Sequence, residues 1–194
     1  HALKQGKLDD AYLVQVIWEY NRVIDVEALR QAWNYAQKRY SALRLRFDWE
    51  EELIQIIDKK GVVEWRFIDI SDQLDSGIRE QRFKAIQKQD RLEPYNLQKS
   101  GLFRIYIIKQ RDDYYNCIFS HHHAILDGWS IPVLIDYVHN VYLRIQNKEN
   151  VELSVDYSYE IAQKYLQEHK DDHRDYWIRY LEQVEEKGNI TLVR

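Results

Sequence analysis

The stretch FSHHHAILDGWS, residues 119–130, holds three histidines, an aspartate and a glycine in a chain that has seven His and six Gly. The run YYNCIFSH, residues 114–121, is rich in aromatic and apolar residues and predicts a strand that leads into this stretch. After Gly128, the apolar residues of 129–147 recur at helical spacing, with Pro132 in the first turn. The histidines are therefore predicted to lie where a strand ends and before a helix begins.

The remaining periodicities predict strands and helices on both sides of that junction. Residues 43–49, LRLRFDW, alternate strictly between apolar and polar side chains, which is the period of a half-buried strand. Helices are predicted over 25–40, 71–94 (ended by Pro94), 129–147 and 157–186, and strands over 11–20, 43–49, 53–57, 62–70, 102–109 and 114–121. Because hairpins are mixed with helices, we expect an α/β (α+β) fold with a mixed, mostly antiparallel sheet flanked by helices.

Composition narrows the class of protein. At 194 residues, 45% of them hydrophobic and 31% charged, the chain suits one globular domain or part of a larger one. No apolar run approaches the roughly 20 residues that cross a bilayer, and the first ten residues lack the apolar stretch of a signal peptide. We therefore expect a cytoplasmic protein that has no membrane partner.

The charge and the cysteine content argue against a nucleic-acid-binding protein and against a catalytic cysteine. With 28 basic and 32 acidic residues and a formal charge of −4, the chain has no basic stripe suited to a phosphate backbone, so no nucleic-acid partner is expected. Cys117 is the single cysteine and lies in an apolar run, so we predict a buried thiol without a catalytic role.

A metal site is one interpretation of the histidine cluster. His121 and His123 alternate on a strand and could both bind zinc, with Asp127 as a third ligand. No second group of ligands at metal-binding spacing supports this interpretation. His169 and His173 are spaced i, i+4 on a predicted helix, but charged residues surround them, which favours a solvated helix face.

Two other interpretations are a nucleophilic triad and purely structural histidines. Ser120 and Ser130 lack the GxSxG turn that exposes a nucleophilic serine. A buried structural role is the ordinary interpretation of any single histidine, but three together at the end of a strand exceed that expectation. Neither interpretation accounts for the cluster as well as acyl transfer does.

Acyl transfer would use a histidine as the base. An imidazole can take a proton from an attacking hydroxyl or amine if it is held in one tautomer and orientation. Asp127, four residues after His123, can fold back through a tight turn, and Gly128 permits a close approach that a β-carbon would forbid. A buried Asp127 would need a partner, which Arg44 or Arg46 could supply.

The cluster carries a family resemblance. The residues His122 to Gly128 read HHxxxDG, which resembles the signature of condensation domains of nonribosomal peptide synthetases, relatives of chloramphenicol acetyltransferase; the sequence continues as DGWS. Further segments that resemble the family, in the right order, are HAL (1–3), RYSALRLRF (39–47, with Tyr40 in place of the usual His), LEPYNLQKSGLFRIYII (92–108) and DYWIRYL (175–181).

The resemblance implies a chloramphenicol acetyltransferase-like lobe and a role for each residue of the motif. His123 would be the base or would position the attacking amine, and His122 would support the turn. Asp127 would be structural and paired with Arg44, while Gly128 would line the substrate tunnel. His121 lies outside the signature and is taken as a strand residue, and no metal is implied.

The resemblance also implies the reaction and the partners. A donor acyl or peptidyl thioester would pass to the amine of an acceptor aminoacyl thioester, forming an amide. Both substrates would be tethered to 4′-phosphopantetheine on donor and acceptor peptidyl carrier proteins, with no cofactor bound to the domain itself. Adjacent adenylation and carrier domains of a multidomain synthetase are expected. DGWS argues against the epimerisation subtype, and the identity of the donor is left open.

The expected domain organisation is one lobe and the start of a connection. Residues 1–156 would form the N-terminal, donor-side lobe, and 157–194 a helical tract leading toward a C-terminal lobe that is absent from this sequence. The fragment by itself is expected to be inactive. Two alternatives remain: a stand-alone coenzyme A-dependent acyltransferase of a small amine or alcohol, and a non-catalytic lobe that docks a carrier protein.

Overall fold

The computed structural model describes residues 12–182 and divides the chain into two compact units, residues 1–156 and 157–194. The HAL segment at residues 1–3 lies outside the described residues. The first unit contains β1 (Leu13–Tyr20), α1 (Val26–Arg39), the 3-10 helix η2 (Ser41–Arg44), β2 (Leu45–Asp48), β3 (Ile54–Ile57), β4 (Glu64–Asp69), α2 (Ser76–Arg91), β5 (Phe103–Arg111), β6 (Tyr114–His122) and α3 (Ser130–Gln146). The second contains α4 (Ser158–Glu168) and α5 (Arg174–Leu181).

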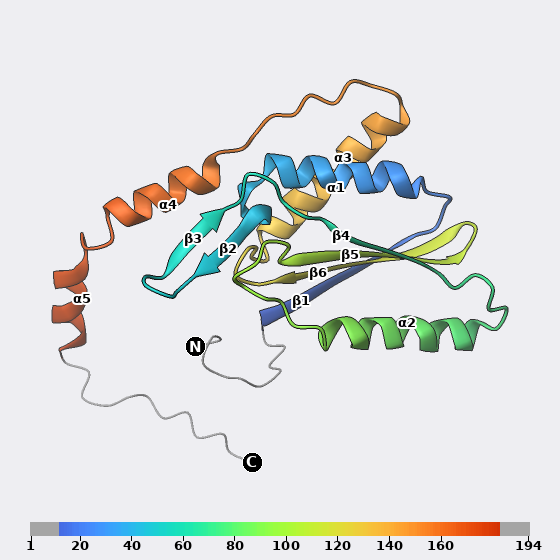
Figure 1. The fold of residues 1–194 in the computed structure, drawn as a ribbon, viewed down its shortest axis with the longest axis horizontal. Coiled ribbons are helices and arrows are strands. Elements are labelled where there is room, and N and C mark those ends of the chain that lie inside the picture. The colour runs from blue at the N-terminus through green and yellow to red at the C-terminus, as the bar shows by residue number, and fades with distance from the viewer. Residues whose placement is uncertain (1–11, 183–194) are drawn as a thin grey trace, which may run out of the picture. The chain divides into compact units, whose positions relative to one another are not determined.

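The first unit is built on a four-stranded sheet in the order β1-β6-β5-β4 (Figure 1). The β1–β6 and β6–β5 pairs are antiparallel, and β4 pairs with β5 in parallel. Strands β2 and β3 form a separate antiparallel pair. In the sequence this pair comes between α1 and β4. The predicted mixed, mostly antiparallel sheet flanked by helices is confirmed.

Helices cover both faces of the sheet: α1 and α3 lie on one side and α2 on the other (Figure 1). On the α1 side, the Trp33 ring packs 5.0 Å from the Phe119 ring and 6.2 Å from the Phe103 ring. On the α2 side the core contains Ile70, Phe83, Tyr106, Ile108 and Ile118. Side chains alternate along β6, so its odd-numbered residues face α1 and its even-numbered residues face α2.

Helix caps follow the sequence signals. The Asp25 carboxylate accepts a hydrogen bond from the Ala28 backbone N–H at 2.9 Å, at the start of α1, and Asp75 caps α2 in the same way. Capping satisfies amide donors that the first turn of a helix leaves without partners. Cys117 is fully buried, as predicted, and burial raises the pKa of its thiol.

Some predicted boundaries were wrong. Leu43 and Arg44, predicted as strand, belong to η2, and the predicted helix over 71–94 is confined to Ser76–Arg91. The tract from 157 is two helices, α4 and α5, separated by a turn. At the end of α4, the His169 imidazole donates from Nδ1 to the Tyr165 carbonyl at 2.8 Å, which satisfies one of the last acceptors of the helix. The predicted helical residues 183–186 lie outside the described part of the chain.

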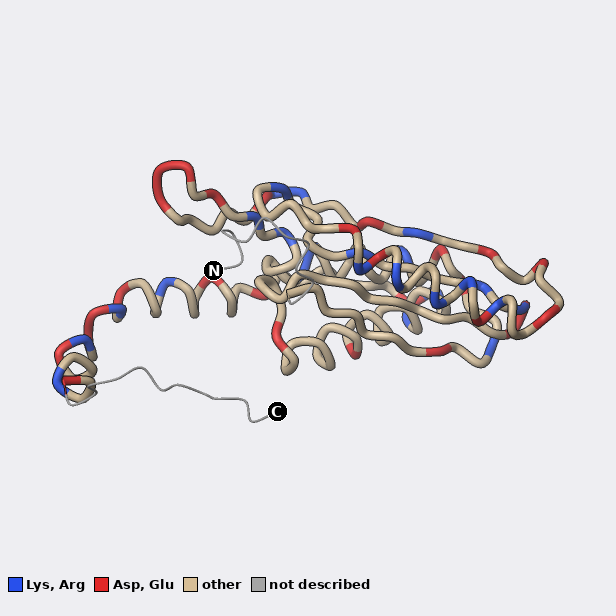
Figure 2. Tube along the Cα trace, turned by 90° about the horizontal axis from the view of Figure 1, so that it is seen from below, with Lys and Arg blue, Asp and Glu red and all other residues tan. Residues whose placement is uncertain are grey.

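Charges of both signs are interspersed along the chain (Figure 2), and acidic residues gather at the turn between β2 and β3, where Glu50, Glu51 and Glu52 are exposed. Within residues 12–182, no helix has the length and apolar character needed to span a membrane.

Candidate functional site

Strand β6 carries the histidines to one end of the central sheet. His122 lies opposite Leu13 of β1 and ends the strand, and His121 lies opposite Phe103 of β5. The His123 backbone N–H continues the pairing by donating to the Tyr12 carbonyl at 2.7 Å, and then the chain turns away. His123 is therefore the first residue past the strand, and its side chain is exposed.

The His123 ring is held by a backbone carbonyl. Its Nδ1 lies 2.9 Å from the Leu126 carbonyl oxygen, which can only accept, so Nδ1 carries the proton. The neutral ring then has its lone pair on Nε2, as a base requires. The expectation that Asp127 would fold back and orient this ring was wrong, because the closer carbonyl of Leu126 takes that position.

His122 is half-buried and packs between two tyrosines. Its Nδ1 accepts a hydrogen bond from the Ala124 backbone N–H at 3.0 Å, so Nδ1 is unprotonated. The Tyr12 ring stacks on it at 5.9 Å, and the Tyr95 ring meets it edge-on at 6.3 Å. Burial, and after it the nearby His123, lower the pKa of His122. The Ala124 contact ties this ring to the turn that precedes Leu126.

His121 points the other way, into the core. It is buried against the Phe119 ring, which lies 4.9 Å away, and neither ring nitrogen has a hydrogen-bond partner within residues 12–182. Burial, with smaller contributions from His123 and His122, lowers the pKa of His121 to about 4. The described residues contain no group of three or more His, Cys, Asp or Glu placed to hold a metal ion.

Asp127 is exposed and binds locally. Its carboxylate accepts from the backbone N–H of Ser130 at 2.8 Å and from the Ser130 hydroxyl at 2.7 Å. These two donors lower the pKa of Asp127. Ser130 is the first residue of α3, so the carboxylate satisfies a backbone N–H in the first turn of that helix, while Trp129 holds the N-cap position without a side-chain cap.

The predicted buried pair between Asp127 and Arg44 was wrong. The Arg44 guanidinium contacts the carbonyls of Asp58 and Lys59, each at 3.4 Å, and Arg46 forms the ion pair with Asp58 at 3.2 Å. The contact between Asp127 and Ser130 closes only three residues and so costs little conformational entropy, whereas a buried ion pair must offset the lost hydration of both charges. The local contact therefore prevails in this structure.

Comparison with known proteins gives the family. A family model described as "Condensation domain" matches residues 3–192 of this chain. The chain belongs to the condensation-domain family. The resemblance carried by the HHxxxDG segment is thereby confirmed, and the motif runs from His122, the last residue of β6, through the turn that follows the strand.

Curated relatives of this condensation domain are very large synthases. An N-(5-amino-5-carboxypentanoyl)-L-cysteinyl-D-valine synthase of Amycolatopsis lactamdurans is 46% identical over 192 residues, which cover 98% of this chain but 5% of that synthase. Gramicidin S synthase 2 of Brevibacillus brevis is 30% identical over 184 residues, 93% of this chain and 4% of that synthase. The chain thus spans a small fraction of these relatives.

Solved condensation domains share the fold. The starter condensation domain of rhizomide synthetase matches with a TM-score of 0.74 at 19% identity, covering 92% of this chain and 46% of that one. The first condensation domain of the calcium-dependent antibiotic synthetase, solved with a substrate analogue, matches with a TM-score of 0.72 at 20% identity, covering 95% and 45%. The chloramphenicol acetyltransferase-like lobe that we expected is confirmed.

Gly128 of this condensation domain has open surroundings. Within the described residues, no atom lies within 4 Å of a β-carbon built there. This lobe therefore imposes no steric requirement for glycine at that position. A tunnel-lining role for Gly128 stays a prediction.

Sequence reasoning missed three contributors to the site. Ser130 was considered only as a nucleophile, whereas in the structure its backbone N–H and hydroxyl both donate to Asp127. Tyr12 and Tyr95 were not considered, because the sequence around a residue does not identify packing partners that are distant in the chain. Ser120 is buried and accepts a hydrogen bond from the Tyr95 hydroxyl at 3.1 Å, so it is not an exposed nucleophile.

Proposed function

We propose that this chain is the histidine-bearing lobe of a condensation domain that forms amide bonds between carrier-bound substrates. One observation carries the proposal: the HHxxxDG histidine His123 is exposed, with Nδ1 on the Leu126 carbonyl and with no hydrogen bond to Nε2 from residues 12–182. This arrangement supports a ring held in one orientation and able to accept a proton. The relatives' names, which describe synthases of peptide products, support a peptidyl or aminoacyl donor.

The proposed reaction has a simple balance. The amine of an acceptor aminoacyl thioester attacks the carbonyl carbon of the donor thioester, and the carbon–sulfur bond breaks. His123 Nε2 accepts the proton that the amine loses and returns it to the departing thiolate. His122 holds the turn, and Asp127 accepts from Ser130 at the start of α3. Both acyl groups arrive on 4′-phosphopantetheine arms, which belong to the carrier proteins and are parts of the substrates.

The domain assignment belongs to the same proposal. Residues 1–156 are the N-terminal, donor-side lobe, and residues 157–194 lead toward a C-terminal lobe. The coverage of about 45% of each solved condensation-domain chain supports this assignment. Donor and acceptor carrier proteins are the proposed partners, within a synthetase that also holds adenylation domains.

The test is a His123→Ala substitution in the complete domain, assayed with loaded donor and acceptor carrier proteins. Loss of a positioned base lowers rates by about 10²-fold or more, and we expect that decrease in amide formed on the acceptor carrier. Mass spectrometry measures the product. His173→Ala, a histidine of the second unit outside the cluster, is the matched control and should keep the wild-type rate.

The outcomes separate the proposal from its alternatives. A folded His123→Ala domain with a near-wild-type rate contradicts the base, and a loss of only a few-fold favours a positioning role. Product formed from acyl-coenzyme A and a small free amine, but not from carrier-bound substrates, supports the stand-alone acyltransferase. A wild-type domain that binds a carrier protein and forms no amide supports the docking lobe.

A further inference from the structure

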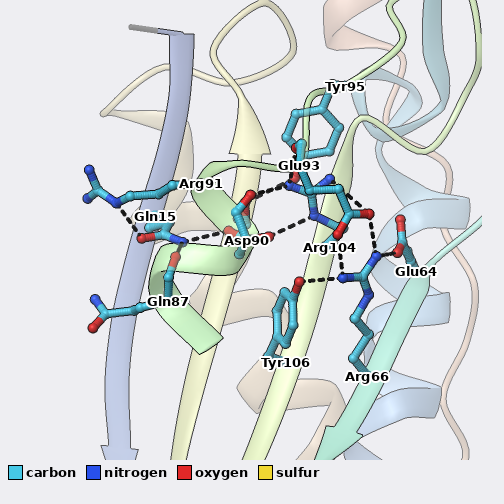
Figure 3. Close-up of polar contacts among 11 residues, drawn as sticks. Gln15, Glu64, Arg66, Gln87, Asp90, Arg91, Glu93, Tyr95, Arg104 and Tyr106 are labelled. Atoms are coloured by element: carbon cyan, nitrogen blue, oxygen red, sulfur yellow. Dashed lines mark hydrogen bonds and ion pairs between the residues drawn. The ribbon is translucent and has the colours of Figure 1, made fainter. Parts of the chain in front are cut away.

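A buried ion pair joins β5 to α2 on the α2 side of the sheet (Figure 3). Arg104 of β5 and Asp90 of α2 are 2% and 0% exposed, and Arg104 Nε donates to Asp90 Oδ1 at 2.7 Å. Arg104 Nη2 donates to the carbonyls of Asp90 and Glu93 at 3.1 and 2.9 Å, and Gln15 of β1 donates to Asp90 Oδ2 at 2.6 Å. Both buried charges are therefore hydrogen-bonded.

Tyr95 connects this ion pair to the end of β6. The Arg104 guanidinium lies 4.1 Å from the centre of the Tyr95 ring, a cation–π contact that is strong when both groups are buried. The Tyr95 hydroxyl donates to Ser120 Oγ, and the ring edge faces His122. Burial raises the pKa of Tyr95, so its hydroxyl stays protonated and able to donate.

A second arginine holds the segment that carries Tyr95. Arg66 of β4 donates to both carboxylate oxygens of Glu93, at 2.7 and 2.6 Å, and to the Tyr106 hydroxyl at 2.5 Å (Figure 3). Glu64 also contacts this guanidinium. Glu93, two residues before Tyr95, is thus tied to the parallel edge strand, which fixes the chain between α2 and β5.

We propose that Tyr95 is a positioning residue for His123, acting through His122 and Ser120. Tyr12 and Tyr95 confine the His122 ring, so that its Nδ1 faces the Ala124 N–H. That contact shapes the turn whose Leu126 carbonyl orients His123. The Arg104 guanidinium packs against the Tyr95 ring. This inference rests on the proposed function, because it holds that the reaction needs a rigid turn.

The test compares Tyr95→Leu, Tyr95→Phe and Tyr142→Leu in the complete domain. Tyr142 of α3 is the matched control: it is also a buried tyrosine, but its hydroxyl accepts a hydrogen bond from the Asp25 backbone N–H at 3.1 Å, outside the network around Arg104 and Arg66. All three are assayed for single-turnover condensation at saturating loaded carriers, for KM of each carrier, and for melting temperature.

We expect Tyr95→Leu to lower the single-turnover rate about 10- to 100-fold, with KM values unchanged, because a small misplacement of a reacting group has costs of that size. Tyr95→Phe keeps the ring and should retain most of the rate. Tyr142→Leu should lower the melting temperature without a comparable loss of rate. If Tyr95→Leu does not fold, Tyr95→Met takes its place.

A second readout does not depend on activity. In the protein labelled with 15N-histidine, the ring nitrogens of His122 should report an unprotonated Nδ1 in the wild type and a mixture of tautomers in Tyr95→Leu. If the wild-type domain is active and Tyr95→Leu changes neither the rate nor the His122 chemical shifts, the inference is overturned. A wild-type domain that forms no amide overturns the proposed function, while the His122 shifts still decide whether Tyr95 holds that ring.

Discussion

At the scale of single residues, the site depends on which partner each polar group takes. His123 is oriented by the Leu126 carbonyl, His122 by the Ala124 N–H, and Asp127 by Ser130. All three contacts span two or three residues of chain. The turn therefore carries most of its own organisation, and tertiary packing adds the rings that surround His122.

The separation of Asp127 from Arg44 can be tested with a double-mutant cycle. We expect Asp127→Ala and Arg44→Ala to have additive effects on the free energy of unfolding, because their side chains share no contact in this structure. Stranding one member of a buried pair would instead cost about 3 to 5 kcal/mol. Urea unfolding of the single and double mutants of the complete domain measures the coupling, with Ser130→Ala as the control that removes one donor to Asp127. A coupling above about 1 kcal/mol would contradict this arrangement.

At the scale of elements, β6 sets how exposed each histidine of the cluster is. The strand alternation buries His121 on the α1 side and leaves His122 on the α2 side, while His123 lies past the last pairing. Three adjacent histidines consequently have three environments. His121 is buried without a hydrogen-bond partner in the described chain, which a core tolerates more readily for a neutral ring than for a charged one.

This burial predicts a pH dependence of stability. The pKa of His121 is about 4 in the folded protein against an ordinary value of 6.5, so below pH 6.5 the unfolded chain binds a proton that the folded chain does not. Stability should fall as the pH drops from 6.5 to 4, by roughly 3 kcal/mol at most. No contribution is expected above pH 6.5.

The measurement is urea unfolding of the wild type and His121→Leu across that pH range. The difference in unfolding free energy between the two should grow in favour of His121→Leu as the pH falls. His173→Leu, at an exposed histidine, is the control and should follow the wild type. A difference that stays constant from pH 7 to pH 4 would show that His121 titrates normally.

At the scale of the whole molecule, the two helices of the second unit expose a large amount of apolar surface. Neither α4 nor α5 has a buried residue. Their exposed large apolar side chains are Tyr157, Ile161, Tyr165, Leu166, Tyr176, Trp177, Ile178, Tyr180 and Leu181. Apolar surface of this extent is typical of helices that pack against another protein surface.

We expect residues 1–194 by themselves to form no amide from loaded carrier proteins. A base contributes little unless a tethered amine and a tethered thioester are held together, and orientation of the reactants supplies most of the rate. The assay adds the downstream half of the domain in trans and follows product by mass spectrometry, with His123→Ala in the first half as control. Turnover by residues 1–194 without the second half would refute this argument and favour a stand-alone acyltransferase.

The sequence by itself determined the features that arise from neighbouring residues. Alternation in residues 11–20 and in LRLRFDW predicted strands, as did the apolar runs that form β5 and β6, and a helix predicted from residue 25 matches the start of α1. The mixed sheet, the buried Cys117 and the HHxxxDG turn after a strand followed from the same reasoning. These features depend on periodicity and on side chains within a few residues, which a sequence displays directly.

Only the tertiary structure decided the partners of the polar groups. Asp127 and Arg44 have complementary charges but are not paired. Asp127 accepts from Ser130 at the start of α3, and Arg44 contacts backbone carbonyls. Asp90 and Arg104 look like surface charges in the sequence and are buried together, with Tyr95 against them. The physical reason is that a polar group takes the partner that the packing of α2, β1, β5 and β6 brings within 3 Å of it, and that packing is a property of the folded chain.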